Sequence, residues 1–119
     1  MIATENVGAV LRDLKTRVAG IATAFIARDG RVISADLPEG VYAETFAIMS
    51  ATILGAAAAA SAELGRTGPG RIVIEGLDTT TVIVGSGEHS LLVAVADSSA
   101  DPEKLLAEVA KFAGFLTRR

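Results

Sequence analysis

The segment from Ala43 to Ala62 constrains the fold of this 119-residue chain more than any other part, because it is rich in alanine and carries a single charge, Glu44. Alanine has the highest helix propensity, so the segment predicts one long helix that ends near Leu64 and is closed by Gly65. Its length suits a membrane span, but alanine is far less hydrophobic than leucine, and Ser50, Thr52 and Ser61 dilute the apolar run further. We therefore expect a helix of a globular domain that is not inserted in a membrane.

The two sides of this helix differ in side-chain size when residues are placed at about 100° intervals. One side, which holds the larger side chains and which we expect to face a sheet, consists of Phe46, Met49, Ile53, Ala57, Ala60 and Leu64. A helix with one face on its own core normally exposes charged residues on the other face, but the opposite stripe here holds nothing larger than alanine. Small residues let a second helix approach closely, although alanine's helix propensity alone could also explain the stripe. We predict that a second copy of the chain packs on this stripe, at Ala47, Ala51, Gly55, Ala58 and Ala62.

The chain before this helix shows one helical and two strand patterns. Apolar residues from Val7 to Val18 recur at helical spacing, and Gly20 stands where that helix should end. The apolar run Ile21–Ala27 and the turn Asp29-Gly30 then predict an antiparallel hairpin. The pair Asp36 and Glu39, separated by a proline, resembles the N-terminal signal of the long helix.

The chain after the long helix predicts three strands, over residues 71–75, 79–85 and 90–96, joined by short turns. A last helix should begin at Pro102, with Asp101 as its capping residue and Leu105 within its buried stripe. The expected order over residues 1–119 is helix, two strands, helix, three strands, helix, all in a single domain. We expect an α+β, two-layer, sandwich-like domain with a five-stranded antiparallel sheet. The long helix should lie on one face of that sheet and the two terminal helices on the other.

The strand predicted over residues 71–75 can lie at an edge of the sheet, since it is short and apolar and has no proline or bulge signal. An unpaired edge can accept a strand from a second copy, and one twofold axis can satisfy the edge and the helix stripe together. We therefore predict a homodimer with a sheet that continues across both copies. Its strand contacts are Arg71, Ile72, Val73, Ile74 and Glu75.

Composition argues against several classes of function. The net charge of −3, without basic clusters, and an aromatic content of 4% disfavour nucleic-acid binding, which needs phosphate neutralisation and base stacking. The chain has no cysteine, which removes thiolate metal sites and cysteine nucleophiles and fits a reducing compartment. The first residues show no secretory signal, so we expect a cytoplasmic protein.

Motifs for catalysis or cofactor binding are weak. The sequence contains no phosphate-binding loop of the GTPase type, and Gly85-Ser86-Gly87 fits a hairpin turn better than a nucleotide site. His89 is the only histidine and has no clustered acids beside it, so it makes a poor metal site. At predicted turns and helix caps, where aspartate is structurally favoured, stand Asp29, Asp36, Asp78, Asp97 and Asp101. We expect no enzymatic activity, no cofactor and no metal ion.

Several of these motifs together resemble the Roadblock family of small dimeric domains. They are Val18-Ala19-Gly20 before an apolar strand, the Asp29-Gly30 hairpin, the alanine-rich helix, the run from Gly70 to Ile74, and the strand Leu91–Val95. The likeness extends from about Val7 to about Leu116. It rests on a pattern of helices and strands rather than on a catalytic signature.

The resemblance implies a non-catalytic dimer that works with small Ras-like GTPases or serves as an adaptor in larger assemblies, such as dynein or membrane-docked GTPase scaffolds. In prokaryotic relatives, the GTPase is often encoded nearby and is bound or stimulated by the dimer. Family members commonly use the paired central helices and adjoining loops as a platform for partners. On this chain, the helical projection places the candidate partner-facing positions beside the small stripe, at Glu44, Thr45, Ser50, Thr52, Leu54, Ser61 and Glu63.

Three functions follow from the sequence. The first is a homodimer that binds a Ras-like GTPase and modulates its nucleotide cycle or its location. The second is a structural adaptor that joins subunits without sensing nucleotide, and the third is a small-molecule sensor, for which no convergent polar groups are visible. Arg28 and Arg31 flank the predicted hairpin tip, where they either keep the hairpin soluble or act on a GTPase as an arginine finger.

Overall fold

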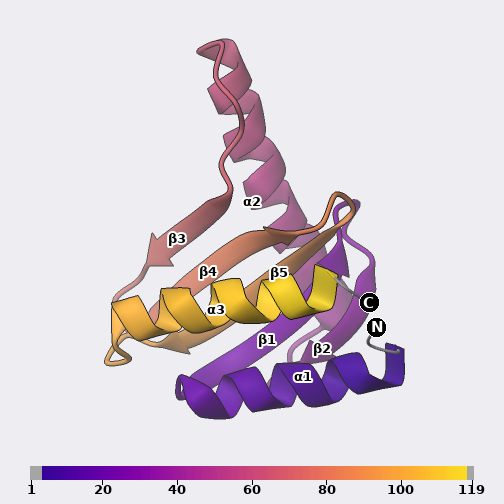
Figure 1. The fold of residues 1–119 in the computed structure, drawn as a ribbon, viewed down its shortest axis with the longest axis vertical. Coiled ribbons are helices and arrows are strands. Elements are labelled where there is room, and N and C mark those ends of the chain that lie inside the picture. The colour runs from indigo at the N-terminus through magenta and orange to yellow at the C-terminus, as the bar shows by residue number, and fades with distance from the viewer. Residues whose placement is uncertain (1–3, 118–119) are drawn as a thin grey trace.

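The computed structural model describes residues 4–117 and contains the predicted elements in the predicted order (Figure 1). They form an α+β fold with one open antiparallel sheet. The helices are α1 (Thr4–Arg17), α2 (Ala43–Glu63) and α3 (Pro102–Thr117), and the strands are β1 (Gly20–Ala27), β2 (Val32–Asp36), β3 (Arg71–Glu75), β4 (Thr79–Ser86) and β5 (Ser90–Asp97).

The five strands lie in the order β2-β1-β5-β4-β3, and every neighbouring pair is antiparallel. The longer strands β1, β5 and β4 occupy the centre, while the short strands β2 and β3 form the two edges. Successive side chains of a strand point to opposite faces of a sheet, so the apolar central strands supply residues to both faces. Helices α1 and α3 lie on one face and α2 lies on the other, as expected (Figure 1), which gives three layers in place of the two named in the prediction.

The face covered by α1 and α3 holds the larger core. Phe25 and Leu92 are completely buried there beneath the predicted stripes of both helices. The N-terminus of α3 is capped as expected, because the carboxylate of Asp101 accepts a hydrogen bond of 3.1 Å from the amide of Glu103. The buried stripe of α3 consists of Leu105, Val109, Phe112, Ala113 and Leu116.

The opposite face holds a smaller core, in which Ile26, Ile83 and Val93 lie under the first half of α2. The second half of α2 extends past the sheet, and the connection to β3 returns beside it (Figure 1). The helix ends as predicted, with Gly65 in a left-handed conformation at φ 68°. This protruding half therefore gains little from the packing of its own domain.

Two predicted helix boundaries are wrong in detail. Asp36 and Glu39 do not start α2, which begins at Ala43 after Tyr42 without a side-chain cap. Asp36 instead ends β2 and forms an ion pair of 3.4 Å with Lys15. After α1, the left-handed residue is Ala19, at φ 50°, rather than Gly20. Gly20 is needed for a different reason, because an added Cβ would lie 2.9 Å from Cγ and 3.2 Å from Cα of Lys15.

Candidate interaction surface

Helix α2 is rotated on the sheet relative to the prediction, so that only part of the small stripe and its neighbours face inward. Ala47 is fully buried, and Ser50 and Leu54 are almost fully buried. Met49 and Ile53, which should have faced the sheet, expose 61% and 39% of their surface. The small side chain of Ala47 allows the helix to lie close to the sheet, and the Ser50 hydroxyl is satisfied locally by donating to the Phe46 carbonyl at 2.9 Å. The helix carries charge only at Glu44 and Glu63, near its two ends, so charge along its middle turns could not indicate which side faces inward.

The two flanks of α2 face different edges of the sheet. Ile48 lies against the β1–β2 hairpin, where a Cβ on Gly30 would come within 3.1 Å of its Cγ1. Met49 and Ile53 occupy the other flank of the helix. Phe46, on that same flank, and Ile72 of β3 pack against the same core cluster. The exposed Met49 and Ile53 therefore lie on the β3 side of the helix.

Strand β3 presents an unpaired edge beside this flank. The Gly70 carbonyl accepts a hydrogen bond of 3.4 Å from the Gly85 amide. Peptide groups alternate in direction along an antiparallel strand, so Arg71, Val73 and Glu75 direct their backbone groups away from β4. Val73 and Ile74 are both exposed. Within the described residues, no other strand pairs with this edge.

The predicted contact residues divide into three groups. Ala47 is wrong as a contact because its surface is buried, and Ala51 is partly buried against the same core. Ser50 and Leu54 are wrong as partner-facing residues for the same reason. The other positions remain accessible: Gly55, Ala58 and Ala62 in the small stripe, the β3 residues, the exposed Glu44, Thr45, Thr52 and Glu63, and the half-buried Ser61.

Both hairpin arginines already have partners within the chain. Arg28 donates to the Gly87 carbonyl at 3.2 Å, and Arg31 forms an ion pair of 2.9 Å with Asp29. The Arg31 backbone amide, and then its guanidinium, lower the pKa of Asp29 below the usual carboxyl value. These contacts stabilise the hairpin tip, and an arginine-finger role remains a prediction.

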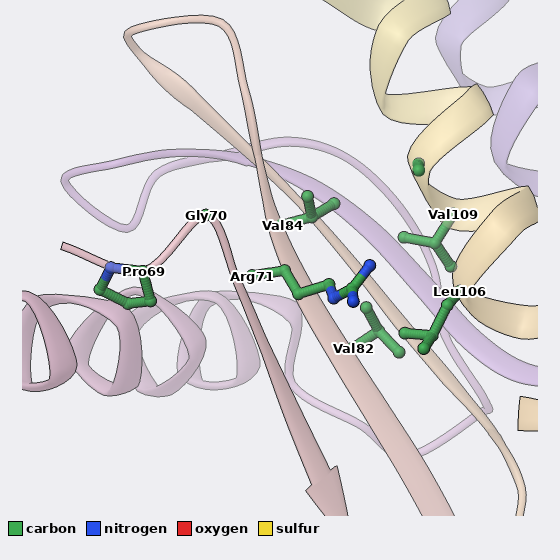
Figure 2. Close-up of a pocket in the computed structure, with 8 residues that line it drawn as sticks. Pro69, Gly70, Arg71, Val82, Val84, Leu106 and Val109 are labelled. Carbon is green, nitrogen blue, oxygen red and sulfur yellow. The ribbon is translucent and has the colours of Figure 1, made fainter. Parts of the chain in front are cut away.

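A groove opens on the other face of the sheet, between α3 and β3 (Figure 2). Its volume is about 480 Å³, and its apolar lining comes mainly from Val84, Leu106 and Val109. Figure 2 shows the side chain of Arg71 extending from β3 toward Val82 and Leu106. Among the described residues, this guanidinium takes part in no hydrogen bond or ion pair.

The part of the chain covered by the structure holds no cluster of three or more potential metal ligands. His89 is highly exposed and lies 3.9 Å from Glu88, at the surface of the β4–β5 turn. Of the described helices, α2 alone is long and apolar enough to cross a membrane by length and composition. The features that stand out are therefore the exposed apolar flank of α2 and the open edge of β3.

Comparison with known proteins decides the family. A model of the Roadblock/LC7 domain matches residues 8–96, which is most of the chain. The chain belongs to the Roadblock/LC7 domain family. This result confirms the resemblance drawn from the sequence, and the family is generally regulatory or adaptor in character.

Individual relatives extend this result. An uncharacterized protein of Methanocaldococcus jannaschii is 34% identical over 84 residues, which is 71% of each chain. The structure of an MglB in a tetrameric arrangement superposes with a TM-score of 0.89 at 25% identity, covering 99% of this chain and 90% of the other. The gliding protein MglB of Thermus thermophilus gives a TM-score of 0.86 at 24% identity, covering 99% and 91%.

Proposed function

We propose that this Roadblock/LC7 chain is a homodimeric regulatory module that binds a small Ras-like GTPase in the cytoplasm and modulates its nucleotide cycle or its location. The observation that carries the proposal is the exposed apolar flank of α2 beside the unpaired edge of β3. Exposed apolar surface of this kind marks an interaction site, and an open strand edge is a template for pairing. Family membership and the likeness to MglB support the regulatory role.

The sequence of β3 is complementary to itself in one antiparallel register. With Val73 opposite its own copy, Arg71 of each strand lies opposite Glu75 of the other. Opposite charges at such cross-strand positions attract each other, and like charges destabilise the pair. The backbone groups of Arg71, Val73 and Glu75 point outward and are available for the new ladder. Charge attraction and the outward hydrogen-bonding groups therefore both favour the register with Val73 opposite its own copy.

The same twofold axis brings the Met49 and Ile53 flanks of the two α2 helices toward each other. This contact replaces the predicted contact through Ala47, while the later stripe residues Gly55 and Ala58 remain open. The side of α2 that faces away from the sheet, called the ridge below, includes Thr45, Thr52 and Glu63. The ridge stays exposed on the paired helices and forms the proposed platform for the GTPase. This arrangement is an isologous dimer, in which both copies use one surface.

Charge reversal on β3 tests the dimer. Arg71→Glu and Glu75→Arg each place like charges opposite each other twice in a symmetric dimer. Each pair contributes about 0.2–1 kcal/mol, and the symmetric dimer contains two such pairs. Each change should therefore raise the dissociation constant of the dimer by up to about thirty-fold. The double variant restores opposite charges and should recover the wild-type dissociation constant, measured by light scattering over a concentration series. Additive weakening in the double variant would contradict this register.

Nucleotide dependence tests the regulatory role. Candidate Ras-like GTPases, loaded with GDP or with a non-hydrolysable GTP analogue, are titrated with the dimer. A regulator must bind the two states with different affinities, and Thr52→Arg on the ridge should abolish that binding while leaving the dimer intact. Equal affinity for both states would favour the nucleotide-independent adaptor, the alternative function.

A further inference from the structure

The turn between β3 and β4 presents an apolar side chain without a contact of its own. Leu77 and Asp78 form this tight turn, which is closed by a hydrogen bond of 2.8 Å from the Gly76 amide to the Thr79 carbonyl. Leu77 is completely exposed. Turn tips favour glycine, asparagine and aspartate, so the local structure gives no reason for leucine at this position.

The α3–β3 groove lies on the same sheet edge, at the opposite end of β3. Pro69, Gly70 and Arg71 form its outer rim, and Leu106 and Ala110 line its wall on α3. Leu77 cannot fill the groove of its own chain, because the length of β3, five residues at about 3.4 Å per residue, separates the two. An occupant must therefore come from another molecule.

We infer that Leu77 of one copy docks into the α3–β3 groove of the second copy. The inference rests on the proposed dimer, whose register sets Arg71 opposite Glu75. Continuing that register by two positions places Leu77 opposite the partner subunit's Pro69, at the rim of the partner's groove. The twofold axis repeats the contact, so each copy inserts one leucine and receives one.

The charges on β3 open the groove for this contact. In the single chain, Arg71 is exposed, has no ionic partner among the described residues and extends over Val82. In the dimer, the partner subunit's Glu75 attracts the Arg71 guanidinium toward the interface between the two β3 strands. The movement uncovers the apolar lining of the groove next to the incoming leucine. Edge pairing and leucine docking thus favour each other.

Cysteine cross-linking can test the contact directly, because the chain has no native cysteine. The variant Val73→Cys should cross-link to its own copy and reports the proposed dimer alone. The double variant Leu77→Cys with Ala110→Cys should give a cross-linked dimer with a short bismaleimide. The matched control replaces Ala110→Cys with Lys104→Cys, which lies on the side of α3 away from the groove and should give no product.

The outcomes separate the two proposals. Cross-linking of Val73→Cys without any product from the Leu77–Ala110 pair would overturn the leucine contact and leave the dimer standing. A monomer in solution, with no product from any variant, would overturn both proposals. As an independent measurement, Leu77→Ser should weaken dimerisation roughly ten- to hundred-fold without changing the circular dichroism spectrum, whereas an unchanged dissociation constant would contradict the docking.

Discussion

The two faces of the sheet are built from the same strands but are covered to different extents. Among the described residues, the buried cluster that α1 and α3 form with one face of the sheet has fourteen members, whereas the cluster that α2 forms with the other face has seven. Leu92 and Leu91 are neighbours on β5 and are equally buried on opposite faces. The difference therefore lies in the helices and not in the strands.

This contrast indicates what each face does. The α1–α3 face is covered by its own chain except at the groove beside β3, and it supplies most of the apolar burial that stabilises the domain. The α2 face carries Met49, Ile53 and Leu64 in exposed positions, which suits cover by another chain. Most of the buried apolar surface therefore lies on the α1–α3 side of the sheet, and most of the exposed apolar side chains of α2 lie on the other side.

A charged residue on each face should separate the two roles most strongly. Val109→Asp buries an unpaired carboxylate on the α1–α3 face, at a cost of several kcal/mol. Because small domains are stable by only about 5–15 kcal/mol, this variant should be largely unfolded. Met49→Asp lies on exposed surface, so the unfolding free energy of the monomer should change by less than about 0.5 kcal/mol while self-association weakens.

Urea denaturation followed by circular dichroism measures the first effect, and light scattering measures the second. The denaturation is performed at a concentration where both proteins are monomeric, since association itself adds stability. A folded Val109→Asp variant, or an unfolded Met49→Asp variant, would remove the distinction between the faces.

The same truncation on each face sharpens the comparison. Leu14→Ala, on the buried side of α1, should cost about 4 kcal/mol because its surroundings are fixed by the sheet and by α3. Leu54→Ala should cost about 2 kcal/mol, since Leu54 lines a shallow surface pocket with Gly55 and α2 can settle into the space. Equal losses of unfolding free energy in denaturant titrations would show that α2 is held as firmly as α1.

The smallest predicted effect is on the pKa values of two aspartates, Asp29 in the β1–β2 turn and Asp97 at the end of β5. Hydrogen bonds from the Ser99 hydroxyl and then from its amide lower the pKa of Asp97, while Asp29 also has the nearby Arg31 charge. A lowered pKa contributes stability above the ordinary carboxyl value near 4, and this contribution is lost as the pH falls through the folded-state pKa. In carboxyl titrations by NMR, added salt should raise the pKa of Asp29 and leave that of Asp97 almost unchanged, because screening acts on the ion pair. If salt changed the pKa of Asp29 as little as that of Asp97, both lowered pKa values would be due to hydrogen bonding alone.

The candidate surface could be predicted only in part. The apolar edge Arg71–Glu75 was evident because a short strand pattern without proline or glycine does not depend on the rest of the fold. The side of α2 that faces the sheet was predicted wrongly, as Ala47 and Met49 show. Leu77 is marked in the sequence by its neighbours, since a leucine between Gly76 and Asp78 is unusual for a turn.

The sequence by itself determined the elements and their order, because helix and strand periodicities, caps and turns are local properties of the chain. It also determined that both faces of the central strands would be buried, since Ile21–Ala27 and Ser90–Ala96 are apolar at nearly every position. Only the tertiary structure decided the rotation of α2. Because α2 carries charge only near its two ends, that rotation depends on how closely Ala47 and Leu54 can approach the strands. The groove beside β3 likewise arises only from the placement of α3 over β4, a contact between segments that are distant in the sequence.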